Sequence, residues 1–210
     1  MKINVSKGFR YHTQRNNLIA PNYSCNVTAM AMGLIYSRIP IDWPGRIQNE
    51  DWLNEILETR EAIDAMEKLA PWAVGKIHPR EINEMLVWVA NKVSGYECDQ
   101  LVEEPVGSIV SQLTKGYAVV TSGKFTVYGH VICVVGAESD QDLSRPLECE
   151  DVDIRTIKNF ILDDPWGNVN ELYMNKNGDD IEISYEYFNE MVTEEGNPNK
   201  KGFHKFVRKK

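Results

Sequence analysis

Residues 128–136 read Tyr-Gly-His-Val-Ile-Cys-Val-Val-Gly, and this run lies where the character of the chain changes. The five residues that follow the histidine are apolar without interruption and end at a glycine, which predicts a buried strand. Upstream of residue 116 the apolar residues recur mainly at helical spacing, and downstream of it they gather in short strand-like runs. Helices and strands segregated in this way predict an α+β fold rather than alternating βαβ units.

Four helices are predicted in the first part of the chain from apolar residues at helical spacing. Ser24 is the candidate N-cap of the first helix, which places Cys25 in its first turn. Pro79 is a favoured first residue for the third helix. The predicted helices cover residues 25–39, 52–69 and 79–93, with a short fourth helix around 109–113.

Strands predominate from residue 117 onward, where β-branched and aromatic residues are bounded by glycines. The sequence Asn177-Gly178 predicts a hairpin between strands at 171–174 and 181–183. The acidic segment 138–156 is expected to be an exposed loop. The remaining predicted strands cover residues 117–121, 128–135 and 160–162.

The composition bounds the kind of protein. The chain has 210 residues, 42% of them hydrophobic, which suits one domain over residues 1–210 with a helical insertion at roughly 41–95. A net charge of -8 opposes binding to a phosphate backbone, so no nucleic-acid partner is expected. The longest apolar stretch free of charged residues, 125–137, is too short to span a bilayer, and no membrane insertion is expected. The N-terminus lacks the apolar run of a signal peptide, which predicts a cytoplasmic protein as synthesised, unless something else releases it.

The four cysteines, Cys25, Cys98, Cys133 and Cys149, include no close pair of the kind that holds zinc. Nothing in the chain argues for disulfides. Cys133 lies inside an apolar strand and is interpreted as a core residue. Cys25 differs, because the unpaired N–H groups and the dipole of a helix N-terminus favour the thiolate form. A small buried hydrophobe is the alternative interpretation of this residue.

His130 and Asp164 are the candidate base and acid that would support a nucleophilic thiol. His130 lies near the start of the strand predicted at 128–135, immediately before its apolar run, and Asp164 follows the next predicted strand along the chain. If these two strands are antiparallel neighbours, the start of the first lies beside the end of the second. Asp164 would then orient the imidazole, as the acid of a catalytic triad does. Asp163 is a second candidate for this acid.

Four motifs occur in one order along the chain. They are Gln-Arg-Asn-Asn at 14–17, Ser-Cys-Asn-Val-Thr-Ala-Met-Ala-Met at 24–32, the run at 128–136, and Phe-Ile-Leu-Asp-Asp-Pro-Trp-Gly at 160–167. Together they resemble the papain-like cysteine peptidases of the bacteriocin-processing, double-glycine leader peptidase type. The resemblance is to the stand-alone bacterial and phage relatives of that type, and it implies the papain-like fold.

The resemblance also implies roles for the residues that match the motifs. Cys25 becomes the nucleophile, His130 the general base and then acid, and Asp164 the residue that orients the imidazole. Gln14 would donate its side-chain amide to the oxyanion hole, beside the backbone N–H of Cys25.

Two points stay open within the resemblance. Asn16 and Asn17 are nearby carboxamides that could replace Gln14 as the oxyanion donor. Many relatives carry glycine after the nucleophile, whereas this chain has Asn26, which narrows the approach to the thiol.

The function expected from these features is hydrolysis of a peptide or related amide bond through a thioacyl enzyme, without a cofactor. The expected substrate is a peptide, either in peptidoglycan, as for a lysin, or in a protein target. A catalytically inactive binding module and an acyl transferase of the transpeptidase type are the alternatives. The sequence leaves the oligomeric state open.

Three other features each have two interpretations. Trp166 either shapes the cleft beside the acid or packs as a lid. Residues 175–180, Asn-Lys-Asn-Gly-Asp-Asp, superficially resemble a calcium loop, but the ligand spacing is wrong, and the hairpin explains them better. No metal site is expected at the histidines either. The cationic segment 200–210 is interpreted as a solvated edge strand or frayed end, with contact to an anionic polymer as the alternative.

Overall fold

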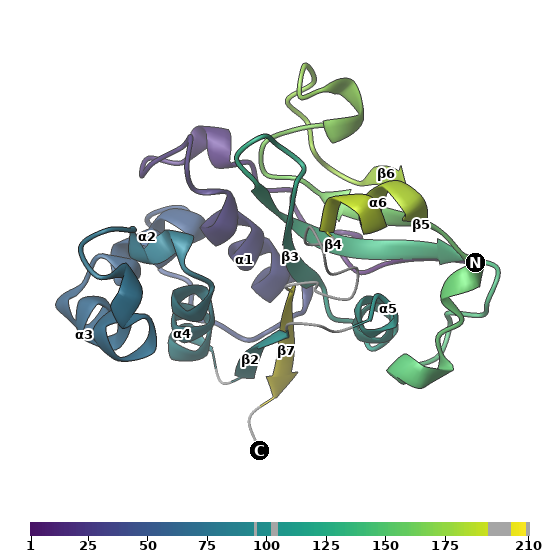
Figure 1. Ribbon diagram of the computed structural model, residues 1–210, viewed down its shortest axis with the longest axis horizontal. Coiled ribbons are helices and arrows are strands. Elements are labelled where there is room, and N and C mark those ends of the chain that lie inside the picture. The colour runs from purple at the N-terminus through teal and green to yellow at the C-terminus, as the bar shows by residue number, and fades with distance from the viewer. Residues whose placement is uncertain (95, 102–104, 193–202, 209–210) are drawn as a thin grey trace.

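A computed structural model describes residues 1–94, 96–101, 105–192 and 203–208 (Figure 1). It combines helices with an antiparallel sheet, which confirms the predicted α+β class. The α-helices are α1 (Cys25–Tyr36), α2 (Asn49–Leu57), α3 (Arg60–Leu69), α4 (Asn83–Val93), α5 (Gly107–Thr114) and α6 (Tyr185–Val192). The 3-10 helices are η1 (Gln14–Asn16), η2 (Pro71–Ala73), η3 (Pro79–Glu81), η4 (Cys149–Asp151), η5 (Ile154–Thr156) and η6 (Val169–Glu171). The strands are β1 (Lys2–Asn4), β2 (Tyr96–Leu101), β3 (Val119–Gly123), β4 (His130–Ser139), β5 (Ile157–Asp163), β6 (Ile181–Ser184) and β7 (Phe203–Arg208).

The sheet runs in the order β2-β7-β3-β4-β5-β6, and β1 pairs with the end of β4. β4 and β5 are antiparallel neighbours, with Cys133 opposite Asp163, so the condition on which the contact between His130 and Asp164 depended is met. β7 pairs with both β2 and β3. The expectation of an edge strand or frayed end is therefore wrong for residues 203–208, because they form an interior strand, while residues 200–202 and 209–210 lie outside the described residues.

β4 is covered on both faces, which explains its uninterrupted apolar sequence. Alternate residues of a strand point to opposite faces. Cys133 and Val135 pack with Met32 and Tyr36 of α1, whereas Ile132 and Val134 belong to the core shared with α5 and α6. Cys133 is fully buried, as expected for a core residue. The strand that begins at His130 is thus fixed against α1, the helix that begins at Cys25.

Helices α1 to α4 gather at one side of the molecule (Figure 1) around a second apolar core. The single helix expected over 52–69 is in fact α2 and α3. The break has a local cause, since the Thr59 side chain accepts a hydrogen bond from the backbone N–H of Ala62 and caps α3. At Pro79 a 3-10 turn forms first, and α4 begins at Asn83.

Two expectations about the second half of the chain are wrong. Residues 138–156 are not an exposed loop throughout, because β4 extends to Ser139 and the side chains of Leu143, Leu147 and Val152 are buried in the sheet core. The hairpin around Asn177-Gly178 does not form. β6 pairs with β5 instead, and Gly178 folds back to accept a hydrogen bond from the backbone N–H of Asp164 (2.8 Å). Within the described part of the chain, no helix is both long and apolar enough to cross a membrane.

Candidate active site

Cys25 is the first residue of α1 and is half-buried. Ser24 precedes the helix as expected, but its hydroxyl accepts a hydrogen bond from Asn17 Nδ2 (2.9 Å) and does not cap the helix. The thiol therefore lies in the first turn of α1, and the Ser24 side chain does not cap the backbone N–H groups of this turn. Those groups and the helix dipole favour a negative charge at this point.

His130 begins β4 immediately after a tight turn. Gly129 has a φ of 79°, a conformation that glycine adopts without steric cost. The turn is closed by a hydrogen bond from Thr126 Oγ1 to the carbonyl of Gly129 (2.6 Å). The imidazole is almost fully buried, with 6% of the residue exposed, and its position is fixed by the backbone of the strand.

Asp164 lies just beyond the end of β5 and accepts a hydrogen bond from His130, with 2.6 Å between Nε2 and Oδ1. The backbone N–H of Trp166 donates to the same oxygen (2.9 Å), and the hydroxyl of Tyr173 contacts the other one (3.3 Å). Asp163 points elsewhere and accepts a hydrogen bond from the backbone N–H of Asp180. Of the two candidate acids, Asp164 is the one in contact with the imidazole.

The imidazole also interacts with the thiol of Cys25, and this interaction changes the acidity of both groups. Burial alone would raise the pKa of Cys25, but the hydrogen bond and positive charge of His130, helped by the backbone N–H groups of Val131 and Asn26, lower it below its ordinary value. Burial alone would lower the pKa of His130, but the hydrogen bonds with Asp164 and Cys25 raise it to about 10. Both shifts favour a thiolate–imidazolium pair over a neutral thiol and imidazole.

Gln14 is buried in the wall of the same cleft as Cys25. Its Nε2 donates one hydrogen to the carbonyl of Pro21 (2.8 Å), and an amide nitrogen carries a second. Asn17 uses its amide nitrogen on Ser24 and Thr28, and Asn16 is exposed and does not line the cleft. Of the three carboxamides, Gln14 is thus the one that lines the cleft together with Cys25.

The cleft around the thiol has a volume of about 710 Å³. Asn26 lies in its wall, with its side-chain amide hydrogen-bonded to the carbonyl of Arg80 and so held toward the helical side. Trp166 also lines the cleft. The guanidinium of Arg15 stacks 3.8 Å above its ring, and Arg15 Nε donates to its carbonyl (2.7 Å). Other lining residues are Asn22, Tyr23, Glu81, Asn83, Ser122, Thr126, Tyr128 and Val131.

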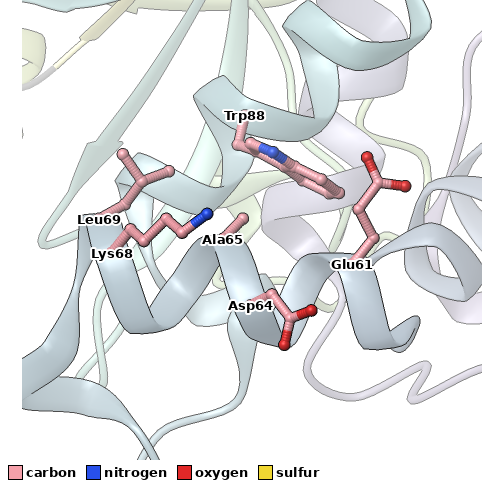
Figure 2. Close-up of a pocket in the computed structure, with 6 residues that line it drawn as sticks. All are labelled: Glu61, Asp64, Ala65, Lys68, Leu69 and Trp88. Carbon is pink, nitrogen blue, oxygen red and sulfur yellow. The ribbon is translucent and has the colours of Figure 1, made fainter.

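A second hollow, of about 430 Å³, lies on the helical side between α3 and α4. Figure 2 shows the ring of Trp88 at its edge, with side chains of α3 along its floor. Glu61, one of these, forms an ion pair with Lys92. The other carboxylate of the lining, Asp64, forms an ion pair with Arg60, and the lining contains no cysteine or histidine, so we assign it no catalytic role.

Sequence reasoning missed two tyrosines that hold the acid in place. Tyr173 contacts the Asp164 carboxylate and packs its ring edge-on against the imidazole, with ring centroids 6.1 Å apart. Tyr11 donates a hydrogen bond to the Asp164 carbonyl (2.5 Å). Residues 171–174 were expected to form a strand, so no local signal connected Tyr173 with the site. Tyr11 lies 153 residues before Asp164 in the sequence, and only the folding of the chain brings its hydroxyl to the Asp164 carbonyl.

The fold and this site define a papain-type cysteine peptidase. Residues 6–193 match the sequence profile of the Peptidase_C39 like family. The chain therefore belongs to this family and is a cysteine peptidase.

One solved structure is similar over the whole chain, the crystal structure of a candidate C39-like peptidase from Bacillus anthracis. The match has a TM-score of 0.58 and 15% sequence identity, and it covers 100% of this chain and 98% of that one. At this identity the likeness concerns the fold alone. A search of curated proteins gives no match.

Proposed function

We propose that the chain hydrolyses peptide bonds with Cys25 as nucleophile, His130 as general base and acid, and Asp164 as the residue that orients the imidazole. The observation that carries this proposal is the single imidazole bound on one side by the thiol and on the other, at 2.6 Å, by a fully buried carboxylate. A histidine merely completing a strand would not need either partner.

The reaction then proceeds by acyl transfer through a thioester. The Cys25 thiolate attacks the carbonyl carbon, and the resulting oxyanion accepts hydrogen bonds from the Gln14 amide and the backbone N–H of Cys25. The His130 imidazolium gives its proton to the leaving amine, and the C–N bond breaks. Water attacks the thioester while neutral His130 takes its proton, which releases the carboxylic acid and restores the thiolate–imidazolium pair.

We propose an extended peptide as the substrate, either in a protein or in the peptide stems of peptidoglycan. The side-chain amides of Asn22 and Asn83 in the cleft wall suit a peptide backbone. Two aromatic rings at the rim stand largely in solvent, Tyr23 at 70% and Tyr128 at 99% exposure. Exposed rings beside a cleft offer contact area to apolar side chains of a peptide. The stand-alone bacterial or phage type implied by the sequence resemblance fits both substrates.

The direct test is digestion of a peptide library and of purified peptidoglycan, side by side, with the purified chain. We expect new amine and carboxyl termini in at least one of them. Cys25→Ala should abolish the cleavage, whereas the matched control Cys149→Ala should keep it, since Cys149 is a half-buried thiol outside the cleft. Equal cleavage by the wild type and Cys25→Ala would overturn the proposal. New amide products after addition of a primary amine would assign the chain to acyl transfer instead.

Thiol alkylation tests the pair without any substrate. Cys25 should react with iodoacetamide at a pH well below the ordinary pKa of a thiol, and His130→Ala should move that reactivity to higher pH, because the imidazolium that stabilises the thiolate is gone. Alkylation of Cys25 that follows an ordinary thiol titration in both proteins would support the inactive binding module.

A further inference from the structure

The segment 175–180 folds back against the end of β5. Gly178 accepts a hydrogen bond from the backbone N–H of Asp164 (2.8 Å), and the backbone N–H of Asp180 donates to Asp163 Oδ1 (2.9 Å). A side chain at position 178 would collide with this strand end, since a Cβ there would lie 2.0 Å from the Asp164 carbonyl oxygen. The expected hairpin, one of the two reasons for rejecting a calcium loop here, is therefore removed, while the ligand spacing within 175–180 still does not match such a loop, so any cation site here needs a ligand from elsewhere in the chain.

This fold-back brings together three carboxylates from two parts of the chain. Asp163, Asp179 and Asp180 each contribute an oxygen, and these oxygens lie within 4.8 Å of one another. Oxygens that share one calcium ion at its usual bond lengths of about 2.3–2.6 Å are separated by up to roughly 5 Å. The spacing therefore fits a common cation, with ligands from both the strand end and the loop.

An independent observation concerns Asp163. The residue is fully buried, and its Oδ2 has no hydrogen-bond partner among the residues that the structure describes. The hydroxyl of Tyr36 also lies near the Asp163 carboxylate, but its 3.3 Å hydrogen bond is to the carbonyl of Arg10. Buried carboxylate oxygens normally have a partner, because leaving one without any is costly. Asp163 thus carries a buried oxygen without a geometric hydrogen bond, on a carboxylate that lies beside two others, which is the arrangement expected of a cation ligand.

The surroundings supply no protein cation. No lysine or arginine within the described ranges forms an ion pair with any of the three carboxylates. Asp180 is held in place by Asn4 Nδ2 (2.7 Å) and Ser6 Oγ (3.2 Å), so its position is already fixed. A divalent cation would supply the positive charge that these three carboxylates lack.

We propose that Asp163, Asp179 and Asp180 form a binding site for a divalent cation, with calcium as the preferred ion. All three ligands are hard carboxylate oxygens. Asp179 and Asp180 are exposed, which leaves room for the water ligands that complete six to eight coordination. Magnesium, which demands near-octahedral geometry and dehydrates reluctantly, fits a site of this shape less well.

The bound cation would fix the loop against β5 and thereby support Asp164. Asp164 is the next residue after one ligand, and its backbone N–H is bonded to Gly178, the residue before another. The site would act as a positioning element for the carboxylate that contacts His130. Cation binding itself does not depend on the proposed peptidase function.

The test is a calcium titration of the full chain after chelator treatment, followed by isothermal calorimetry and thermal unfolding. At about a hundredfold excess over the dissociation constant, calcium should raise Tm by roughly 5 °C or more. Asp179→Asn should remove most of this shift. The matched control Asp42→Asn, an exposed carboxylate in the loop after α1, should keep it.

Asp163→Asn provides a second test, which stays informative if the loop variants fail to fold. The quantity measured is again Tm, with and without calcium. Without calcium the variant should be more stable than the wild type, because no unpartnered buried carboxylate remains, and calcium should no longer raise its Tm. No Tm shift of the wild type at about 10 mM calcium, a concentration that saturates even weak calcium modules, would overturn the proposal. So would equal shifts in Asp179→Asn and Asp42→Asn. Because both readouts work on Cys25→Ala protein as well, the result is separate from that of the cleavage assays.

Discussion

At the scale of single residues, His130 is held between two partners, Asp164 and Cys25, that both raise its pKa. The carboxylate of Asp164 fixes one ring nitrogen and leaves the other for Cys25. The proton shared by thiol and imidazole therefore belongs to the pair, and its position depends on both neighbours. Removing either Asp164 or Cys25 should therefore change the pH at which His130 and the other remaining group titrate.

The pH dependence of kcat/KM follows from these shifts. Activity should fall at low pH as the Cys25 thiolate takes up a proton, at a pKa lowered from that of a free thiol. It should fall again at high pH as His130 loses the proton it gives to the leaving amine, at a pKa raised to about 10. Asp164→Asn should move the alkaline limb to lower pH, since the carboxylate raises the pKa of His130. If kcat/KM began to rise only at pH values above the ordinary pKa of a thiol, this result would contradict the thiolate–imidazolium pair.

Residue Tyr173 offers a milder change at the same carboxylate. Tyr173→Phe removes the hydroxyl near Asp164 Oδ2 but keeps the ring against the imidazole. The hydroxyl hydrogen is shared between this carboxylate (3.3 Å) and the carbonyl of Phe125 (3.2 Å), and its loss should lower kcat/KM by about tenfold, equivalent to roughly 1.5 kcal/mol. Peptide hydrolysis by the variant measures this. Tyr187→Phe, a half-buried tyrosine of α6, is the control and should be close to wild type.

At the scale of elements, the loop at 175–180 determines where the end of β5 lies. Gly178→Ala would place a methyl group against the Asp164 carbonyl and 2.8 Å from the Tyr11 hydroxyl. Crowding of this kind costs about 1–3 kcal/mol, and displacement of the acid by about 1 Å can reduce turnover by up to about 10²-fold. Urea unfolding and peptide hydrolysis measure the two effects.

Gly75→Ala is the matched control for this substitution. Gly75 has a φ of 71° but open space around it, so alanine there should cost about 1–2 kcal/mol and leave activity unchanged. Wild-type activity of Gly178→Ala would show that the loop does not position Asp164.

Elements with local signals could be predicted from the sequence. The start of α1 at Cys25, the strand beginning at His130 and the turn at Asp164 are each specified by their immediate neighbours. The break at Thr59 also has a local signal, the N-cap threonine, whereas the missing hairpin and the role of Tyr173 depend on contacts between distant parts of the chain. The hairpin signal at Asn177-Gly178 lost to contacts with a strand end that lies more than ten residues earlier, and such contacts leave no local pattern.

At the scale of the whole molecule, the thiol and the imidazole belong to different packing units. Cys25 opens a helix of the helical core, whereas His130 opens a strand of the sheet. The interface between the two includes Met32 and Tyr36 of α1 against Cys133 and Val135 of β4. The packing of α1 against β4 therefore sets the distance between the Cys25 thiol and the His130 imidazole, although the contacting residues lie further along both elements than the two catalytic candidates.

Substitutions in that interface should affect catalysis as well as stability. Met32→Ala should cost about 2–5 kcal/mol and also lower kcat, because α1 can shift relative to β4. Met66→Ala, at a similarly buried position inside the helical core, should cost a similar amount but leave kcat unchanged in conditions where both variants are folded. Equal kcat values for the two variants would contradict a role of this interface in positioning.

The stacking of Arg15 on Trp166 has a practical consequence. Of the five tryptophans, Trp166 alone follows residue 88 and lines the cleft, while the other four lie within residues 43–88. Its indole emission depends on the cation above it and on water in the cleft, both of which an arriving peptide would disturb. With the other four replaced by phenylalanine in the Cys25→Ala background, the protein would carry a built-in fluorescent reporter of cleft occupancy, and substrate peptides could be ranked by binding before any bond is cut.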